Sequence, residues 1–266
     1  MKTTVPTLVR LVMMLACLAS GHAVMGQTSQ DRFINSNGVR IRYQTWGQGP
    51  PVILIHGFGE SLESWQRGGV VRSLSPHFQV IALDMRGQGR SDKPHDPKSY
   101  GTELSGDIVR VLRHLGIPKA HIVGYSMGAL VALDFAVLHQ EHTLSVVLGG
   151  AGLNPPSTLD DFRQQAEAFE QGKVPGREGD DPKALAALLR GLRVLSEEDV
   201  RRIHVPMAVL IGANDRFMPS VQRLSRILPA TQVTVIPDVD HATAPSHRKF
   251  TQALLAFLLK QKPATR

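Results

Sequence analysis

The pentapeptide Gly124-Tyr125-Ser126-Met127-Gly128 has the residue types and spacing that most directly indicate chemistry. It follows the short apolar segment 121–123 and runs straight into an apolar, helix-prone segment, 129–139. A serine between two glycines at a strand-to-helix junction sits on a sharp turn. That turn exposes the hydroxyl and directs the first amides of the helix toward the group it attacks. Ser126 is therefore predicted to be the nucleophile of an acyl transfer.

A serine hydroxyl is a weak nucleophile and needs a base within hydrogen-bond distance. Of the eleven histidines, His241 is preferred because it follows the last apolar strand, at the edge where ligands bind in parallel sheets. His247 is a competitor that lies in or next to the final helix. His139 and His142 resemble a metal-ligand pair, but the sequence places no third ligand nearby. We therefore expect neither a metal nor another cofactor.

The base needs a buried carboxylate that orients its ring and stabilises its cation. Asp215 follows the apolar segment 208–211 and lies one strand before His241, which makes it the preferred acid. Asp238 and Asp240 are alternatives, but their closeness to His241 in the sequence makes it hard for them to face its far nitrogen.

Two backbone amides are predicted to hold the developing oxyanion. The Met127 amide directly follows the nucleophile at the start of a helix. The Phe58 amide lies in His56-Gly57-Phe58-Gly59, after the strand 52–55, where glycines on both sides let the backbone approach a ligand closely. The ring of Phe58 is free to pack in the core at the same time.

The elements that must position these residues alternate along the chain. Residues 33–46 are predicted to form a hairpin around Asn37-Gly38. Continuously apolar, β-branched strands then alternate with amphipathic helices, which predicts an α/β fold with a doubly wound, mostly parallel sheet. The continuous apolar character predicts that these parallel strands are covered on both faces. The predicted strands are 52–55, 80–84, 122–125, 146–148, 208–211 and 233–236.

Residues 154–204 interrupt this alternation. They are charged, helix-prone and broken by glycine and proline, a composition that suits a helical cap inserted between core segments 27–153 and 205–266. A surface insertion with no role in binding is the alternative, but long insertions in compact α/β domains are usually lids or binding loops.

The N-terminus is typical of a cleavable secretory signal over residues 1–26, with basic Lys2 and Arg10 before a short apolar stretch. We expect an exported, periplasmic or extracellular protein, cleaved after Ala23 or Gly26 and left without a membrane span. A buried first helix is the alternative. Cys17, the single cysteine, matches a lipid-anchoring site poorly, so a lipid anchor is a minority interpretation.

The net charge of +7 is not gathered in a basic run with aromatics. We therefore interpret it as solvated surface and expect no nucleic-acid partner. The expected partner is a small-molecule acyl substrate. The sequence gives no indication of oligomeric state.

The chain resembles the α/β-hydrolase fold superfamily, serine-nucleophile branch. The resemblance rests on 56–59, 124–128, 212–215 and 240–241, in the family's order of nucleophile, acid and histidine, and on 84–91, whose charged and glycine residues shape a loop in that family. A Phe after His-Gly and a Met after the serine also occur in the esterase and cofactor-free haloperoxidase-like subgroup. The resemblance implies a Ser126–His241–Asp215 triad with a helical cap.

The favoured reaction is hydrolysis of a carboxylic ester or a related acyl bond. Haloalkane dehalogenases and epoxide hydrolases of this fold use an aspartate where Ser126 stands, which argues against both reactions. Carbon–carbon bond hydrolase, lactonase, thioesterase and perhydrolase activities remain open, because they use the same serine triad. A slow-turnover ligand sensor is an alternative from a different class, although an export signal leaves it no obvious intracellular partner.

Overall fold

The computed structural model describes residues 30–261, and the predicted signal segment with Cys17 lies outside them. Eight strands form one sheet in the order β1-β2-β4-β3-β5-β6-β7-β8. The first two strands pair antiparallel and β2 runs antiparallel to β4, whereas the remaining neighbours are parallel. The predicted hairpin and the mostly parallel sheet are therefore confirmed. The strands are β1 (Arg32–Ser36), β2 (Val39–Trp46), β3 (Pro51–Ile55), β4 (Gln79–Leu83), β5 (Ala120–Tyr125), β6 (Thr143–Gly149), β7 (Met207–Gly212) and β8 (Gln232–Ile236).

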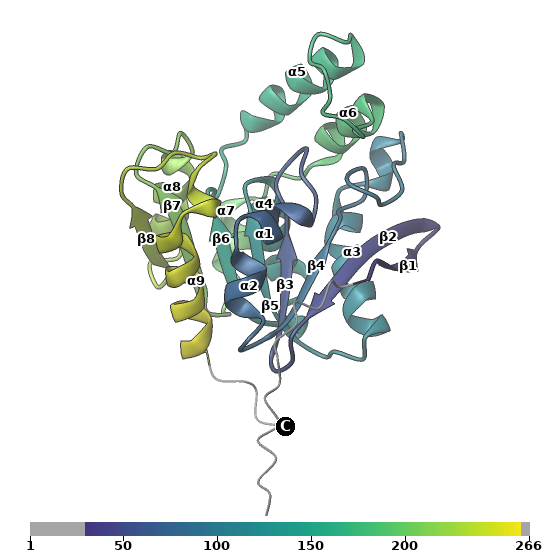
Figure 1. The fold of residues 1–266 in the computed structure, drawn as a ribbon. Helices are drawn as coiled ribbons and strands as arrows, with labels where there is room; N and C mark the ends of the chain where they lie inside the picture. The colour runs from purple at the N-terminus through teal and green to yellow at the C-terminus, as the bar shows by residue number, and fades with distance from the viewer. Residues whose placement is uncertain (1–29, 262–266) are drawn as a thin grey trace, which may run out of the picture.

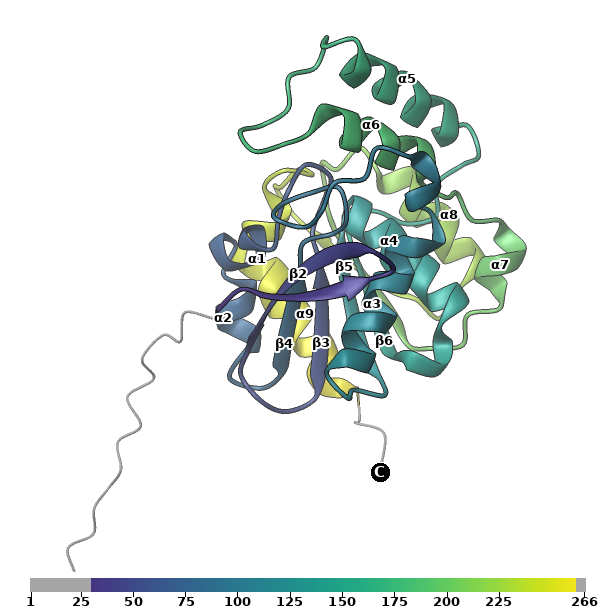
Figure 2. The ribbon, with the colours of Figure 1, turned by 90° about the vertical axis from the view of Figure 1, so that its right-hand side faces the viewer.

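Helices cover both faces of this sheet, as Figures 1 and 2 show. One face carries α1 (Glu63–Arg67), α2 (Val70–Leu74) and α9 (Arg248–Lys260). The other carries α3 (Thr102–His114), α4 (Met127–Leu138), α7 (Glu197–Arg201) and α8 (Met218–Ile227). Single 3₁₀ turns form at η1 (Pro97–Ser99), η2 (Gln140–His142) and η3 (Ala244–Ser246). Within residues 30–261, no helix has the length and apolar character needed to cross a bilayer.

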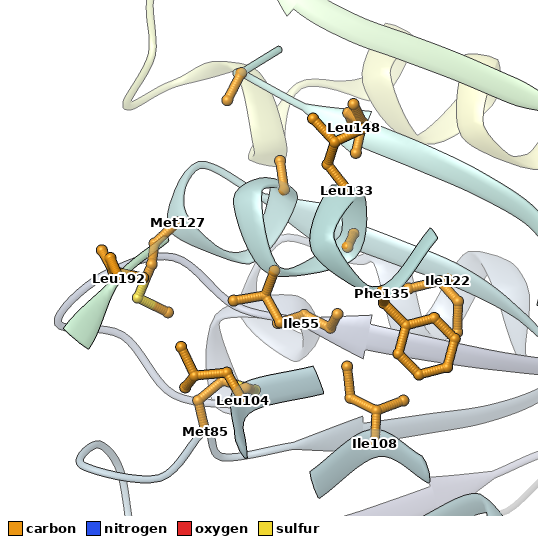
Figure 3. Packing of buried hydrophobic residues seen from close by; sticks show 14 of the residues in the cluster. Ile55, Met85, Leu104, Ile108, Ile122, Met127, Leu133, Phe135, Leu148 and Leu192 are labelled. Atoms are coloured by element: carbon orange, nitrogen blue, oxygen red, sulfur yellow. The ribbon is translucent and has the colours of Figure 1, made fainter. Parts of the chain in front are cut away.

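The alternation of side chains along the central strands divides the interior into two cores. In β3, Ile53 and Ile55 point to the core that contains α3 and α4, whereas Val52 and Leu54 point to the core that contains α2 and α9. Figure 3 shows the first core, where side chains of α3 and α4 pack over Ile55 and its neighbours. Burial on both faces explains why these strands are continuously apolar.

Strand β8 differs from the other parallel strands because it ends the sheet. Four of its five residues are exposed, and Val233 and Val235 are 41% and 48% exposed. The expectation that every apolar parallel strand is covered on both faces is therefore wrong for β8. A short β-branched run has the same pattern at the edge of a sheet as at its centre, so periodicity alone does not separate them.

The segment 154–204 folds into three helices that lie in two different places. Helices α5 (Thr158–Glu170) and α6 (Pro182–Gly191) pack against each other at one end of the sheet, above the strands in Figures 1 and 2. Helix α7 lies beside α4 and α8 in the core layer. The action of α5 and α6 as a lid stays a prediction.

The central strand β5 contains a histidine, His121, that is 1% exposed. Its Nδ1 lies 2.7 Å from the Ser145 hydroxyl oxygen. Its Nε2 has no hydrogen-bond partner among the described residues. Burial lowers the pKa of His121 from 6.5 to about 4, because a charged ring would place a second N–H in an apolar interior.

This burial predicts a loss of stability in mild acid. Below about pH 6.5 the unfolded chain binds a proton at this site that the folded chain does not, so the free energy of unfolding falls as the pH decreases toward 4. A shift from 6.5 to about 4 corresponds to about 3 kcal/mol. Urea unfolding should show His121→Asn losing about that much less stability than the parent between pH 7 and pH 4. The same change at exposed His77 is the control, and equal acid sensitivity of parent and His121→Asn would contradict the assignment.

Candidate active site

The nucleophile candidate lies on a strained turn between β5 and α4. Ser126 has φ 55° and ψ −116°, in a region that side-chain-bearing residues rarely adopt. A Cβ on Gly124 would lie 1.9 Å from the carbonyl oxygen of Gly128, and a Cβ on Gly128 would lie 2.2 Å from the carbonyl oxygen of Ile55. Both positions therefore require glycine, because the neighbouring backbone leaves no room for a Cβ on this sharp turn.

Three side chains from separate segments form a hydrogen-bonded series at this turn. The Ser126 Oγ lies 2.8 Å from His241 Nε2, and His241 Nδ1 lies 2.8 Å from Asp215 Oδ2. Because a carboxylate only accepts, Nδ1 carries the proton and Nε2 of the neutral ring is left to accept the serine proton. The side chain of Asp215 is fully buried, whereas that of His241 is 24% exposed. This arrangement can activate a hydroxyl nucleophile.

The rival residues are engaged elsewhere. Asp240 accepts from the Ala242 and Thr243 amides and from the Thr243 hydroxyl, within its own turn. His247 caps the start of α9 by accepting from the Lys249 amide. Asp238 is exposed. Among residues 30–261, no three His, Cys, Asp or Glu side chains are grouped to hold a metal ion.

Both predicted oxyanion donors line the same cavity as Ser126. Met127 is the first residue of α4, and the first amides of a helix have no partner within it. Phe58 lies in the loop after β3, and its ring packs at 5.8 Å from the ring of Phe169. The ring of Phe58 is therefore packed as expected, whereas the role of its amide as an oxyanion donor stays a prediction.

Buried His56 anchors this loop. Its Nε2 accepts from the Met85 amide at 3.0 Å, and its Nδ1 donates to the Gly57 carbonyl at 2.8 Å. Burial of the whole ring is the main cause of a lowered pKa of His56. The lowered pKa favours the neutral ring, whose Nε2 can accept the hydrogen bond from the Met85 amide. The sequence identified His56 only as part of the loop and not as its anchor.

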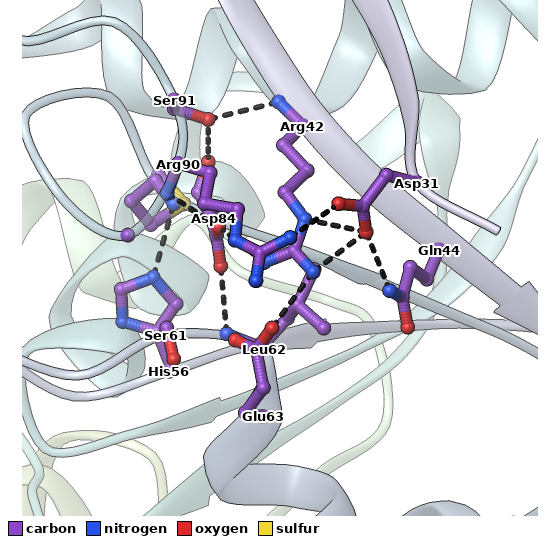
Figure 4. Close-up of polar contacts among 12 residues, drawn as sticks. Asp31, Arg42, Gln44, His56, Ser61, Leu62, Glu63, Asp84, Arg90 and Ser91 are labelled. Carbon is purple, nitrogen blue, oxygen red and sulfur yellow. Dashed lines mark hydrogen bonds and ion pairs between the residues drawn. The ribbon is translucent and has the colours of Figure 1, made fainter. Parts of the chain in front are cut away.

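A buried ionic network supports the loop after β4, as Figure 4 shows. Asp84 accepts from the Leu62 amide at 2.7 Å and from the Arg90 amide at 2.8 Å. Arg42 pairs with Asp84 at 3.0 Å, and also with Asp31 and Glu63. Charged residues in 84–91 therefore do shape this loop, as the resemblance implied.

Gln88 is a residue of this loop whose function the sequence did not reveal. It is fully buried. Its Oε1 accepts from the Gly59 amide at 2.5 Å, and its Nε2 donates to the Met127 Sδ at 3.6 Å. Gln88 therefore joins the two segments that carry the predicted oxyanion donors.

We expect Gln88→Leu to lower kcat for ester hydrolysis by about tenfold with little change in KM. The donors act mainly in the transition state, and deleting one outright typically costs 10²–10³-fold, so displacing one should cost less. Steady-state kinetics on a p-nitrophenyl ester would measure both constants. Gln222→Leu on an exposed part of α8 is the matched control. A rise in KM alone would show that Gln88 serves substrate binding instead.

Two aromatic residues hold His241 in place. The Tyr125 hydroxyl donates to the His241 carbonyl at 2.5 Å, and its ring lies 5.3 Å from the imidazole. The Phe217 ring meets the imidazole edge-on at 4.8 Å, while the Phe217 amide donates to Asp215 Oδ1 at 2.9 Å. In the sequence, Tyr125 stands out only as part of the pentapeptide 124–128, and no pattern distinguishes Phe217.

The site opens into a cavity of about 470 Å³, a size suited to a small organic ligand. Of the apolar residues in the segment 154–204, Phe162, Leu189 and Leu192 line it. Leu185 and Leu188 are instead buried in the core, as is Phe169, whose ring packs near the ring of Phe58. The cavity is bounded by the loop after β3, the turn at Ser126, α5, the end of α6, and the loops after β7 and β8.

The chain is similar in sequence to a protein-family model and to known hydrolytic enzymes. A family model described as alpha/beta hydrolase fold matches residues 50–175. The 2-hydroxy-6-oxo-6-(2'-aminophenyl)hexa-2,4-dienoic acid hydrolase of Metapseudomonas resinovorans is 29% identical, over 89% of this chain and 93% of that protein. The pimeloyl-[acyl-carrier protein] methyl ester esterase of Vibrio vulnificus (strain YJ016) is 29% identical, over 82% of this chain and 97% of that protein.

Solved structures share the fold. The enol-lactonase from Burkholderia xenovorans LB400 aligns with a TM-score of 0.74 at 22% identity, over 86% of this chain and 100% of that chain. At this identity the likeness concerns the fold alone. The chain therefore has the α/β-hydrolase fold, and its sequence is similar to the sequences of α/β hydrolases.

Proposed function

We propose that this protein is a serine hydrolase that cleaves a carboxylic ester or a related acyl bond. The observation that carries the proposal is the pair of 2.8 Å hydrogen bonds that joins Ser126, His241 and Asp215 at the wall of a ligand-sized cavity. Of the two nearly full-length relatives, one is named as a hydrolase and the other as an esterase.

The reaction follows from the direction of these hydrogen bonds. Ser126 Oγ attacks the ester carbonyl carbon while its proton passes to His241 Nε2, and Asp215 stabilises the imidazolium. The carbonyl oxygen becomes the oxyanion, which the Phe58 and Met127 amides bind. The C–O bond then breaks, and the imidazolium protonates the leaving alkoxide. Water, deprotonated by His241, hydrolyses the acyl-enzyme and returns Ser126 to its hydroxyl form.

Carbon–carbon bond hydrolysis is the second candidate, because the Metapseudomonas relative is named for hydrolysis of a dienoic acid. A purified-protein panel of an ester, a lactone, a thioester and a vinylogous diketone, each analysed for products, separates the candidates. Cleavage of the diketone with no cleavage of the ester would replace the first proposal by the second.

Covalent labelling tests the nucleophile independently of the substrate. A fluorophosphonate phosphonylates an activated serine and releases fluoride, so mass spectrometry should find the adduct on the peptide that contains Ser126. An adduct on a different serine, or none under conditions of ester turnover, would contradict the assignment.

We also propose export of the protein, on the pattern of residues 1–26. Intact-mass measurement of protein recovered from the periplasm or medium should give a chain that begins at Val24 or Gln27. Recovery of the uncleaved chain from the cytoplasm alone would contradict export.

A further inference from the structure

The charges around the active-site cavity are unequal. Among the described residues that line it, Glu60 is the only carboxylate, whereas Arg67, Arg177 and Arg216 provide three guanidinium groups. Glu60 is shared between two of them, with Arg67 at 3.2 Å and with Arg177, which also donates to the Gly59 carbonyl. One negative charge thus faces three positive ones, and the cavity wall attracts anions.

Arg216 differs from the other two arginines. It has no carboxylate partner within the described part of the chain. Its guanidinium carbon lies 4.9 Å from the centre of the Phe217 ring. That ring in turn lies 4.8 Å from the imidazole of His241. The cation is therefore held against the ring that packs on the His241 imidazole.

The backbone around Arg216 is also fixed by the catalytic site. Arg216 lies between Asp215, which holds His241, and Phe217, whose amide donates to Asp215. The guanidinium is therefore attached to a turn that cannot move without disturbing the hydrogen-bonded series. Much of the remaining cavity wall is apolar, and includes Phe58, Leu130, Phe162, Leu189 and Leu192.

We propose that Arg216 binds a carboxylate carried by the substrate, so that the enzyme prefers esters with an apolar body and a free acid group. A guanidinium presents a planar pair of donors that matches the two oxygens of a carboxylate. This inference rests on the proposed ester hydrolysis and names the class of substrate for it. The acid group belongs either to the acyl chain or to the alcohol, and the test has an arm for each.

The acyl arm compares mono-p-nitrophenyl adipate with p-nitrophenyl methyl adipate, which has the far acid capped as a methyl ester. The alcohol arm compares the butyrate esters of 4-hydroxybenzoate and of methyl 4-hydroxybenzoate. In one arm, Arg216→Gln should lower kcat/KM for the acid substrate by about tenfold and for its capped partner by less than about twofold. Arg216→Lys should recover part of the loss because it keeps the charge, and added salt should weaken the preference of the parent.

Arg226→Gln is the matched control, since Arg226 is exposed on α8 and does not line the cavity. It removes the same net charge and should leave both substrates of each pair unaffected. Equal losses for acid and capped substrates in both arms of Arg216→Gln would overturn the inference while ester hydrolysis stands. If the parent cleaves none of the four esters, the proposed function itself has failed.

Discussion

Ser126→Ala should lower kcat for ester hydrolysis by about 10⁴- to 10⁶-fold, the range that loss of a triad nucleophile produces elsewhere. The variant keeps the cavity, the two backbone donors and the His241–Asp215 pair, but it has no atom to form the acyl-enzyme. Substrate affinity should therefore change little, and the loss should fall almost entirely on turnover. Single-turnover kinetics with a p-nitrophenyl ester measures both.

The control for this experiment is Ser225→Ala on α8, a serine that does not line the cavity. It should retain the parent rate. Circular dichroism and thermal unfolding should show Ser126→Ala folded, since alanine must only adopt the backbone angles that serine already adopts. Parent-like turnover in a folded Ser126→Ala would remove the serine-hydrolase proposal.

Much of the fold could be predicted because its signals are local. The strand-to-helix turn at 124–128 needs two glycines, and their contacts show why: each would place a Cβ inside a neighbouring carbonyl group. The parallel strands were recognisable because side chains such as those of Ile53 and Leu54 are buried on opposite faces. Chain order then predicted which three side chains meet, and Ser126, His241 and Asp215 do lie in contact.

The supporting contacts could not be predicted because they depend on side-chain direction after folding. Tyr125 reaches a carbonyl group 116 positions away in the sequence, and Arg177 reaches one 118 positions away. In the sequence, Gln88 looks like an ordinary polar loop residue. Only the structure shows that its Oε1 and its Nε2 both form hydrogen bonds. No periodicity encodes such contacts, since they arise only when separate loops converge at one sheet edge.

The hydrogen bonds of Asp215 predict a second large effect, a loss of turnover in Asp215→Asn. Its Oδ1 accepts from the Phe217 amide at 2.9 Å, and its Oδ2 faces His241 Nδ1 at 2.8 Å. In Asp215→Asn the amide oxygen would stay on the Phe217 N–H, which turns the NH₂ group toward His241. Nδ1 must then accept and Nε2 must carry the proton, so the ring can no longer take a proton from Ser126.

We therefore expect Asp215→Asn to lower kcat by about 10⁴-fold, the size of effect seen when a triad carboxylate becomes an amide. Fluorophosphonate labelling of Ser126 should slow in parallel, because the serine loses its base in both reactions. Asp238→Asn is the control, since Asp238 is exposed and its positive φ of 62° suits asparagine equally well. If turnover falls in Asp215→Asn but labelling of Ser126 does not slow, the defect lies after acylation. Unchanged turnover would show that Asp215 does not orient the base.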